Sequence, residues 1–193
     1  MLSSTKWILK SREYGLLCKQ IFTSSLNILK KNIKNNKNPA IIMDIDETVL
    51  NNITFQIENK GNFCENKWEK WVLKEQCTLI PGVESYISEI RKLDIQIIYI
   101  SNRKHDLLIP TINNLKKLKI YNYNDIFLLQ ANIQDSKERR RKEVKNNSGR
   151  ISNFPKFNVL QYLGDQYEDF ESLDSELFGL KNFLLPNPVY FKL

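Results

Sequence analysis

The amino-acid sequence predicts an α/β protein in which helices cover both faces of a parallel sheet. Two observations support this class. Short apolar runs alternate along the chain with segments whose apolar residues have helical spacing, and strands that alternate with helices pair in parallel. Polar side chains follow directly after the apolar runs, as expected where chemistry collects at the carboxyl ends of parallel strands.

Length and composition set the scale of the molecule. A chain of 193 residues is long enough for one well-packed domain and short for two. Its composition, with 41% hydrophobic and 26% charged residues, is that of a globular protein. No apolar run approaches the roughly 20 residues that span a bilayer, so we expect no transmembrane segment. We therefore expect a single domain over residues 1–193.

The N-terminal region, residues 1–38, has the pattern of a helical extension. From residue 4 to about residue 34, apolar side chains recur at helical intervals on one stripe. The pattern predicts one or two amphipathic helices, which end in the polar stretch before Pro39. The residues of the stripe are Trp7, Tyr14, Leu17, Ile21 and Ile28.

Apolar runs predict the strands of the sheet. The first, residues 40–43, is short, continuous and bounded by turn signals, as a strand buried on both faces is. Similar runs lie at residues 95–100, 126–129, 159–163 and 183–185. Helices are predicted between them at residues 83–93, 106–118 and 137–147.

Polar residues follow the first four predicted strands. Because the carboxyl ends of parallel strands meet at one edge of a sheet, we expect these side chains to converge on one site. They are Asp44 and Asp46 after the first strand, Ser101 and Asn102 after the second, Lys137 a few residues beyond the third, and Asp165 and Asp169 after the fourth.

The residue types point to a metal-dependent reaction. Asp44 and Asp46 are two residues apart, so both can face the same side of an extended segment. Clustered carboxylates are costly unless a cation neutralises them, and a hard, oxygen-rich site suits Mg²⁺. We therefore expect Mg²⁺ to be bound by Asp44, Asp46, Asp165 and Asp169.

The same side chains suit phosphoryl transfer. A carboxylate can attack phosphorus, as in enzymes that form an aspartyl-phosphate, and a second acid nearby can protonate the leaving alkoxide and then activate water. Ser101 and Lys137 would hold the phosphoryl oxygens. Structural alternatives remain: Ser101 or Asp169 could cap a following helix, and Lys137 could belong to a solvated basic face.

These residues, in this order, resemble the haloacid dehalogenase (HAD) superfamily. The resemblance implies a Rossmann-like three-layer core, with Asp44 as nucleophile and Asp46 as acid/base. It also implies that Ser101, Asn102 and Lys137 hold phosphate, that Asp165 binds the metal, and that Asp169 supports the metal and its waters. An acid at the position of Asp46 marks the phosphatases and phosphomutases of that superfamily.

Further motifs extend over nearly the whole chain. They are Trp7 with Glu13-Tyr14, the Trp68 and Trp71 pair, Pro81-Gly82, Ser101-Asn102-Arg103, residues 114–118, residues 136–140, Gly164-Asp165 through Asp169-Phe170, and residues 185–190. Together they resemble the class C acid phosphatases, relatives of the bacterial lipoprotein e(P4) family of 5′-nucleotidases. The resemblance implies hydrolysis of phosphomonoesters, including nucleoside monophosphates and nicotinamide mononucleotide, at mildly acidic pH.

Three features depart from that family. One is that the chain stops at Leu193, just after Tyr190, where relatives continue with a Gly and a Trp. Gln166 stands where its members usually have Asn. Members are usually exported, often with a lipidated N-terminal Cys, whereas this sequence shows no leader or lipobox. As written, the chain predicts a cytoplasmic protein; a removed leader would place it in the cell envelope or outside the cell.

Residues 51–80 lie where this fold places a small helical cap over the site. Aromatic rings can stack a nucleobase for about 1–3 kcal/mol each, so Trp68 or Trp71, with Tyr190, could bind a nucleoside. The alternative is that both tryptophans pack the cap onto the core.

The chain has three cysteines, Cys18, Cys64 and Cys77. Cys64 and Cys77 could form one disulfide bridge, or all three could be thiols.

The net charge of +7 is compatible with more than one function. It could steer anionic substrates toward the protein, or reflect a lysine- and asparagine-rich composition on solvated faces. A basic nucleic-acid-binding module using residues 137–145 is one alternative, and a catalytically weak surface protein with this fold is another. The phosphatase hypothesis explains all four strand-end motifs. It expects a small phosphomonoester as partner and no nucleic acid, and it leaves a homo-oligomer open.

Overall fold

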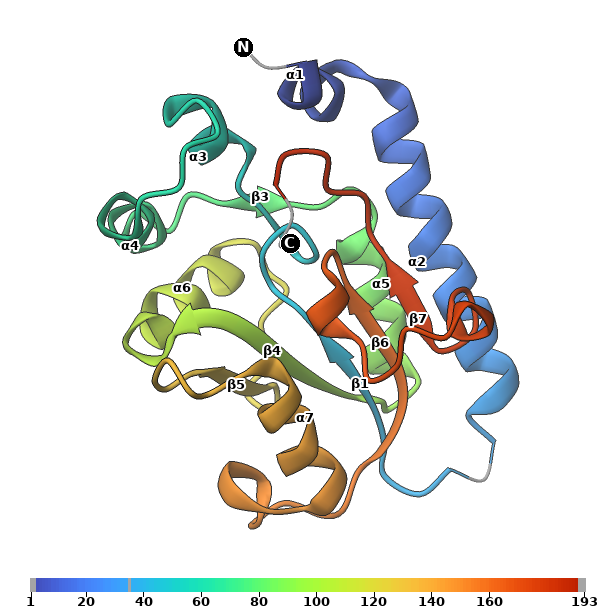
Figure 1. Cartoon of the computed structure of the whole chain (residues 1–193). Helices are drawn as coiled ribbons and strands as arrows, with labels where there is room; N and C mark the ends of the chain where they lie inside the picture. The colour runs from blue at the N-terminus through green and yellow to red at the C-terminus, as the bar shows by residue number, and fades with distance from the viewer. Residues whose placement is uncertain (1–2, 35, 191–193) are drawn as a thin grey trace.

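The computed structural model describes residues 3–34 and 36–190, and its centre is a five-stranded sheet (Figure 1). The strands pair in the order β5-β4-β1-β6-β7, and every pairing is parallel. The predicted α/β class is therefore confirmed, and each predicted run overlaps a strand, with at most one residue outside it. The strands are β1 (Pro39–Met43), β4 (Gln96–Lys104), β5 (Ile126–Gln130), β6 (Asn158–Gly164) and β7 (Asn182–Leu184).

The central strand β1 is apolar because both of its faces are covered. Ile41 and Met43 pack into the core on one face, and Ala40 and Ile42 pack into the core on the other. Successive side chains of a strand point to opposite faces, so each side chain of residues 40–43 meets one of the two apolar cores. The first polar side chain, that of Asp44, comes where β1 ends.

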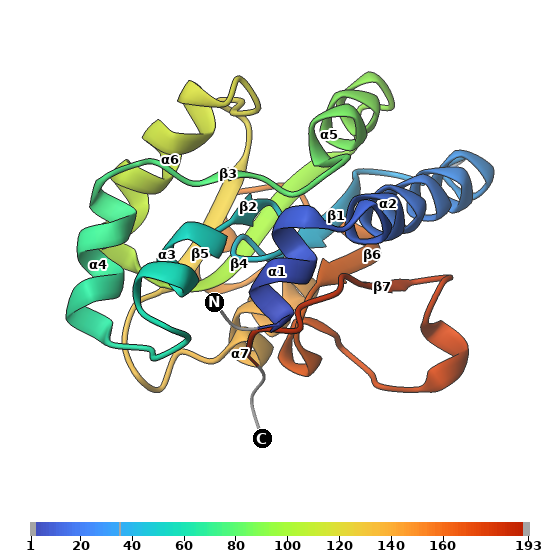
Figure 2. The ribbon, with the colours of Figure 1, turned by 90° about the horizontal axis from the view of Figure 1, so that it is seen from above.

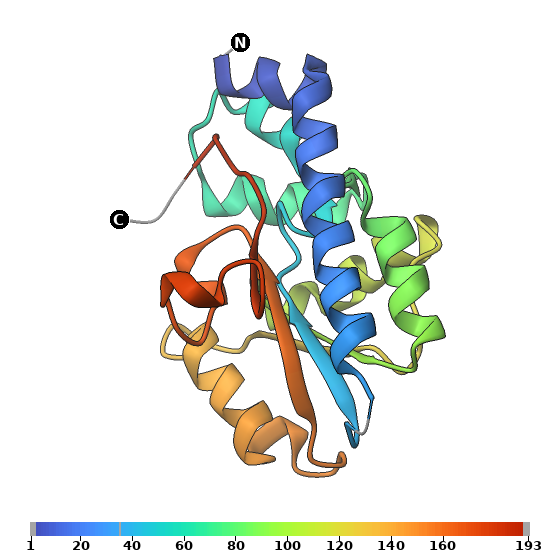
Figure 3. The same cartoon turned by 90° about the vertical axis from the view of Figure 1, so that its right-hand side faces the viewer.

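Helices on both faces complete three layers, which Figure 3 shows from the side. Tyr14, Cys18 and Phe22 of α2 share one core with Tyr86 and other residues of α5, whereas Val144 of α7 belongs to the opposite core. The helix predicted at 106–118 begins with a 3₁₀ turn at His105–Leu107. The covering helices are α2 (Arg12–Asn32), α5 (Val83–Lys92), α6 (Leu108–Lys117) and α7 (Lys137–Asn146).

The N-terminal region forms two helices, α1 (Ser3–Lys10) and α2. Ser11 separates them and caps α2, because its side chain accepts a hydrogen bond from the Tyr14 backbone N–H at 3.1 Å. From above, in Figure 2, α1 lies beside α3 (Ile53–Glu58). Within the described residues, no helix is long and apolar enough to cross a membrane.

Residues 51–80 leave the core and return to it at nearly the same point. β2 (Leu50–Asn51) and β3 (Thr78–Leu79) pair antiparallel, and Ile80 N donates to Val49 O at 3.1 Å. Between these strands the chain forms α3 and α4 (Glu65–Leu73), which Figures 1 and 2 show to one side of the carboxyl ends of the main strands.

The helix α7 is basic, yet much of its charge points inward. Lys137, Arg140 and Arg141 are buried, and Arg140 donates to the backbone oxygens of Ser101 and Leu128. The other cations of the helix, Arg139, Lys142 and Lys145, are exposed, so α7 has a buried basic side and an exposed one. The solvated-face alternative for Lys137 is wrong, because its side chain is buried.

All three cysteines are thiols in the structure. Cys18 and Cys77 are buried, whereas Cys64 is exposed. The Cys64–Cys77 bridge, which the sequence left open, is therefore absent.

Candidate active site

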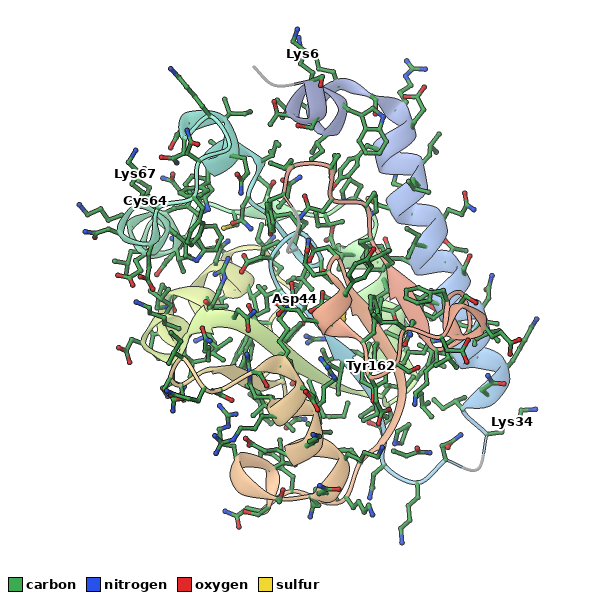
Figure 4. The ribbon with its side chains drawn as sticks, in the orientation of Figure 1. Lys6, Lys34, Asp44, Cys64, Lys67 and Tyr162 are labelled. Atoms are coloured by element: carbon green, nitrogen blue, oxygen red, sulfur yellow. The ribbon has the colours of Figure 1, made fainter. Side chains whose placement is uncertain are left out.

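The side chains that follow the strands gather at the carboxyl edge of the sheet. Figure 4 shows Asp44 near the middle of the molecule, whereas Cys64 and Lys67 lie at its outer edge. A cavity of about 500 Å³ opens at this edge. Its walls include six of the residues singled out from the strand ends, namely Asp44, Asp46, Ser101, Asn102, Lys137 and Asp165.

Lys137, the first residue of α7, links two buried carboxylates. Its Nζ donates to Asp44 Oδ1 at 2.6 Å and to Asp169 Oδ1 at 2.5 Å. Burial alone lowers the pKa of Lys137, but the two carboxylates outweigh it and hold the pKa above its ordinary value. The ammonium is therefore charged and fixed beside Asp44.

Three carboxylates form a compact acid group. Asp44, Asp165 and Asp169 are all buried, and one oxygen from each lies within 4.8 Å of the others. Burial and the neighbouring charge of Asp169 raise the pKa of Asp165 to about 6, and burial raises the pKa of Asp44 well above its usual range. One ammonium does not balance three carboxylates, so a hard, oxygen-binding cation such as Mg²⁺ fits this donor set.

Asp169 is held in that group by backbone donors. Its Oδ2 accepts from the N–H groups of Asp165 and Gln166 at 3.0 and 2.9 Å. It thereby closes the 3₁₀ turn Tyr167–Asp169, of which it is the last residue. No helix begins at Phe170, which is extended, so the alternative that Asp169 caps a following helix is wrong. Gly164 is necessary here, because a Cβ at that position would lie 2.2 Å from the Asp169 Cβ.

Asp46 lies apart from the acid group, although the sequence placed it among the metal ligands. Its carboxylate accepts from Arg103 Nη2 at 2.6 Å and Nε at 3.0 Å, and from Asn52 Nδ2 at 2.9 Å. This two-pronged pairing turns the side chain toward β4. Arg103, almost completely buried, had no role in the sequence prediction; its place directly after Ser101-Asn102 was the one available signal.

Ser101 and Asn102 both lie within β4 and line the cavity. Ser101 Oγ accepts from Arg103 N at 3.2 Å. Because β4 continues to Lys104, Ser101 does not cap a helix, and that alternative is wrong. Asn102 donates to Glu168 Oε1 and accepts from Arg140 Nη2, both at 2.6 Å. Phosphate binding by these two residues stays a prediction.

The aromatic candidates separate into two environments. Trp68 and Tyr190 line the cavity, and the Arg103 guanidinium lies 5.6 Å from the centroid of the Trp68 ring. Trp71 is only 4% exposed and donates its indole N–H to Asn52 Oδ1 at 2.9 Å. The structure therefore does not bring Trp71 to the cavity, because its ring packs in the core.

Phe63 is an aromatic wall residue that the sequence analysis did not single out. It is 70% exposed, and its ring centroid lies 6.3 Å from that of Trp68. Both residues line the cavity. The available signal was its position five residues before Trp68, within the segment expected to cover the site.

Comparison with protein families supports a relationship over almost the whole chain. The family model described as HAD superfamily, subfamily IIIB (acid phosphatase), matches residues 3–193. A stem 31 kDa glycoprotein of Glycine max is 27% identical over 163 residues, or 80% of this chain and 60% of the relative. Acid phosphatase 1 of Solanum lycopersicum is 23% identical over 153 residues, or 78% of this chain and 58% of the relative. The chain thus spans about three fifths of these curated relatives.

A solved structure agrees with this relationship. The class C acid phosphatase of Bacillus anthracis superposes with a TM-score of 0.84 and 27% identity. The match covers 97% of this chain and 84% of the bacterial one. A second structure of that enzyme, with tungstate bound, has a TM-score of 0.84 and 26% identity.

Proposed function

The chain belongs to subfamily IIIB of the HAD superfamily, the acid phosphatases, and from this premise we propose that it is a Mg²⁺-dependent phosphomonoesterase. One observation carries the proposal: Lys137 joins Asp44 to Asp169 in the wall of a cavity that Asp165 also lines. A nucleophile, a fixed cation and a cluster of metal-binding oxygens are thus in one place.

In the first half-reaction, an Asp44 carboxylate oxygen attacks the phosphorus of the monoester. A bond forms between that oxygen and phosphorus while the bond from phosphorus to the ester oxygen breaks. Asp46, in its protonated form, gives its proton to the departing alkoxide. Since Asp46 is paired with Arg103 in this structure, its carboxyl group turns from Arg103 toward the ester to do so.

In the second half-reaction, Asp46 removes a proton from a water molecule. The water oxygen bonds to the phosphorus of the aspartyl-phosphate, and the bond between phosphorus and Asp44 breaks. Inorganic phosphate leaves, Asp44 is again a carboxylate, and Asp46 again carries a proton. The reaction is a net hydrolysis and needs no oxidant or reductant.

Charge stabilisation belongs to the groups around Asp44. Lys137 holds positive charge beside the attacking oxygen, and Ser101 and Asn102 offer a hydroxyl and an amide to the phosphoryl oxygens. Asp44, Asp165 and Asp169 would hold Mg²⁺, which when bound neutralises the acid group and polarises the phosphoryl group.

The wall of the cavity supports a phosphomonoester whose leaving group carries an aromatic ring, such as a 5′-nucleotide or nicotinamide mononucleotide. Residues 51–80 act as the cap in this proposal and contribute Phe63 and Trp68 to the wall, while Tyr190 comes from the other end of the chain. A volume of about 500 Å³ is within the usual range for small-molecule sites.

Asp44→Asn tests the proposal. Without a carboxylate nucleophile, kcat for an aryl phosphate in Mg²⁺ should fall by roughly 10⁴-fold or more. Circular dichroism should be unchanged, because Asn has the same shape and removes a charge that burial disfavours. Wild-type protein that binds Mg²⁺ but hydrolyses no phosphomonoester, from nucleotides to sugar phosphates, would contradict the proposal and favour a surface protein that kept the fold.

A further inference from the structure

The chain after β7 folds back over the acid group. Leu185 N donates to Gly164 O at 2.8 Å, which extends the parallel pairing of β6 and β7 by one step. Residues 186–190, called here the C-terminal strap, then continue past the loop after β6. In Figures 1 and 3 this red segment climbs from β7 toward the end of the molecule that holds α1.

Asn187 of the strap points its amide at a member of the acid group. Its Oδ1 accepts from Val189 N at 3.0 Å, so its other amide atom, Nδ2, is the donor to Asp165 Oδ2 at 2.8 Å. Pro186 and Pro188 flank it. Because each proline fixes its own φ and restricts the residue before it, the backbone of Asn187 is held as well.

Gln166 donates to the same carboxylate oxygen. Its Nε2 lies 2.8 Å from Asp165 Oδ2, so two amide N–H groups bind that one atom. The other oxygen, Oδ1, makes a long 3.4 Å contact with Thr48 Oγ1. Asp165 is thus held through one oxygen, which leaves Oδ1 as the oxygen with capacity for a cation.

The far end of the strap is anchored on the loop after β1. Tyr190 Oη donates to Glu47 Oε2 at 2.5 Å, and Glu47 Oε1 accepts from Asn52 N at 2.9 Å. The strap therefore joins the two loops that carry Asp44 and Asp165. This double attachment explains how a segment with little regular structure can hold Asn187 in place.

We propose that Asn187 and Gln166 are positioning residues that orient Asp165 and thereby set the affinity of the site for a divalent cation. The inference rests on the proposed function, since it takes Asp165 to be a metal ligand. An Asn at position 166 would be one methylene shorter. Here the longer side chain of Gln166 reaches the carboxylate of its own neighbour.

Mg²⁺ binding to metal-free protein, measured by isothermal titration calorimetry, tests the proposal. Asn187→Ala and Gln166→Ala should each raise the Mg²⁺ Kd by about 10-fold, and the double variant by more, because groups that orient metal ligands usually contribute 10–100-fold in affinity. Asn113→Ala is the matched control. It removes a hydrogen bond, also 2.8 Å long, from the Asn113 amide to the carboxylate of Glu75. Neither residue is among those lining the cavity, so the Kd should be unchanged.

Kinetics distinguish positioning from a general loss of structure. In both single variants, the Mg²⁺ concentration for half-maximal activity should rise with the Kd, while kcat at saturating Mg²⁺ stays within about 3-fold of the wild type. Lower kcat at every Mg²⁺ concentration with an unchanged Kd would overturn the proposal.

The outcomes separate this inference from the proposed function. If the wild type binds Mg²⁺ and hydrolyses phosphomonoesters but the folded variants bind Mg²⁺ as tightly, the positioning role is wrong and the function stands. If the wild type binds no Mg²⁺, both are wrong. Should Asn187→Ala fail to fold, Gln166→Ala decides, because it changes no residue of the strap and keeps the hydrogen bonds from Asn187 to Asp165 and from Tyr190 to Glu47.

Discussion

At the scale of single residues, pairing decides what each acid can do. Asp44 and Asp46 are separated by one residue but have different partners: a lysine for Asp44, and an arginine and an amide for Asp46. A buried charge is stable only with such partners. The two aspartates can therefore serve as nucleophile and proton carrier without competing for the same cation.

Substitution of Arg103 should show whether Asp46 depends on its own partner. Arg103→Met removes the two-pronged contact that holds Asp46 beside β4, so the carboxyl group that must turn toward the ester loses its defined position. We expect kcat to fall by about 10²-fold, since small misplacements cost that much, and the free energy of unfolding to fall by about 3 kcal/mol, as for a broken buried pair. Steady-state kinetics and urea unfolding measure the two effects.

Arg103→Lys is the companion variant. It keeps the charge but loses the forked geometry, so its kcat should lie between those of the wild type and Arg103→Met. Wild-type kcat in folded Arg103→Met would show that Asp46 needs no such support.

At the scale of elements, residues 51–80 combine a buried and an exposed aromatic surface. α4 places Trp71 against the core and Trp68, three residues earlier, on the cavity side. Residues three apart lie on neighbouring parts of a helix surface, so one face of α4 can contact both the core and the cavity. Both rings pack on Phe55, whose ring centroid lies 5.1 Å from that of Trp68 and 6.2 Å from that of Trp71.

The two tryptophans should therefore respond differently to truncation. Trp71→Ala should lower the free energy of unfolding by about 3–5 kcal/mol, because it empties a buried site and removes a donor from Asn52. Trp68→Ala should raise the KM for a 5′-nucleotide by about 10-fold, as loss of one stacking contact does, with a smaller loss of stability.

A phosphomonoester without a ring, such as glycerol phosphate, is the control substrate. Its KM should be the same in Trp68→Ala and the wild type. An equal rise in KM for both substrates would argue against stacking on Trp68.

At the scale of the whole molecule, the site is assembled from segments spread along the chain. Asp44 and Lys137 are 93 residues apart in sequence, and Glu47 and Tyr190 are 143 apart. The acid group at their meeting point has more negative than positive charge at close range. Its stability should therefore depend on a bound cation.

Removal of the metal should separate activity from folding. EDTA should abolish hydrolysis while circular dichroism keeps its shape, because the two apolar cores do not involve the acid group. Mg²⁺ added back at 100 times its Kd should raise the free energy of unfolding by about 2.7 kcal/mol. The same ionic strength supplied as NaCl should not do so, and full activity in protein shown to be metal-free would contradict the role of Mg²⁺.

The sequence by itself determined the fold class and the edge where the polar residues gather. Buried parallel strands require continuous apolar runs, and such runs are local patterns. Their ends are local too, so residues 40–43 and 159–163 both predicted strands and indicated where Asp44 and Asp165 would lie.

Only the tertiary structure decided the partners. The sequence did not predict that Arg103 would pair with Asp46, that Trp71 would face the core while Trp68 faces the cavity, or that Asn187 would reach Asp165. Each of these depends on a distance of a few ångströms between segments far apart in the chain. Such distances follow from how helices and loops pack on the sheet, and local spacing does not encode that packing.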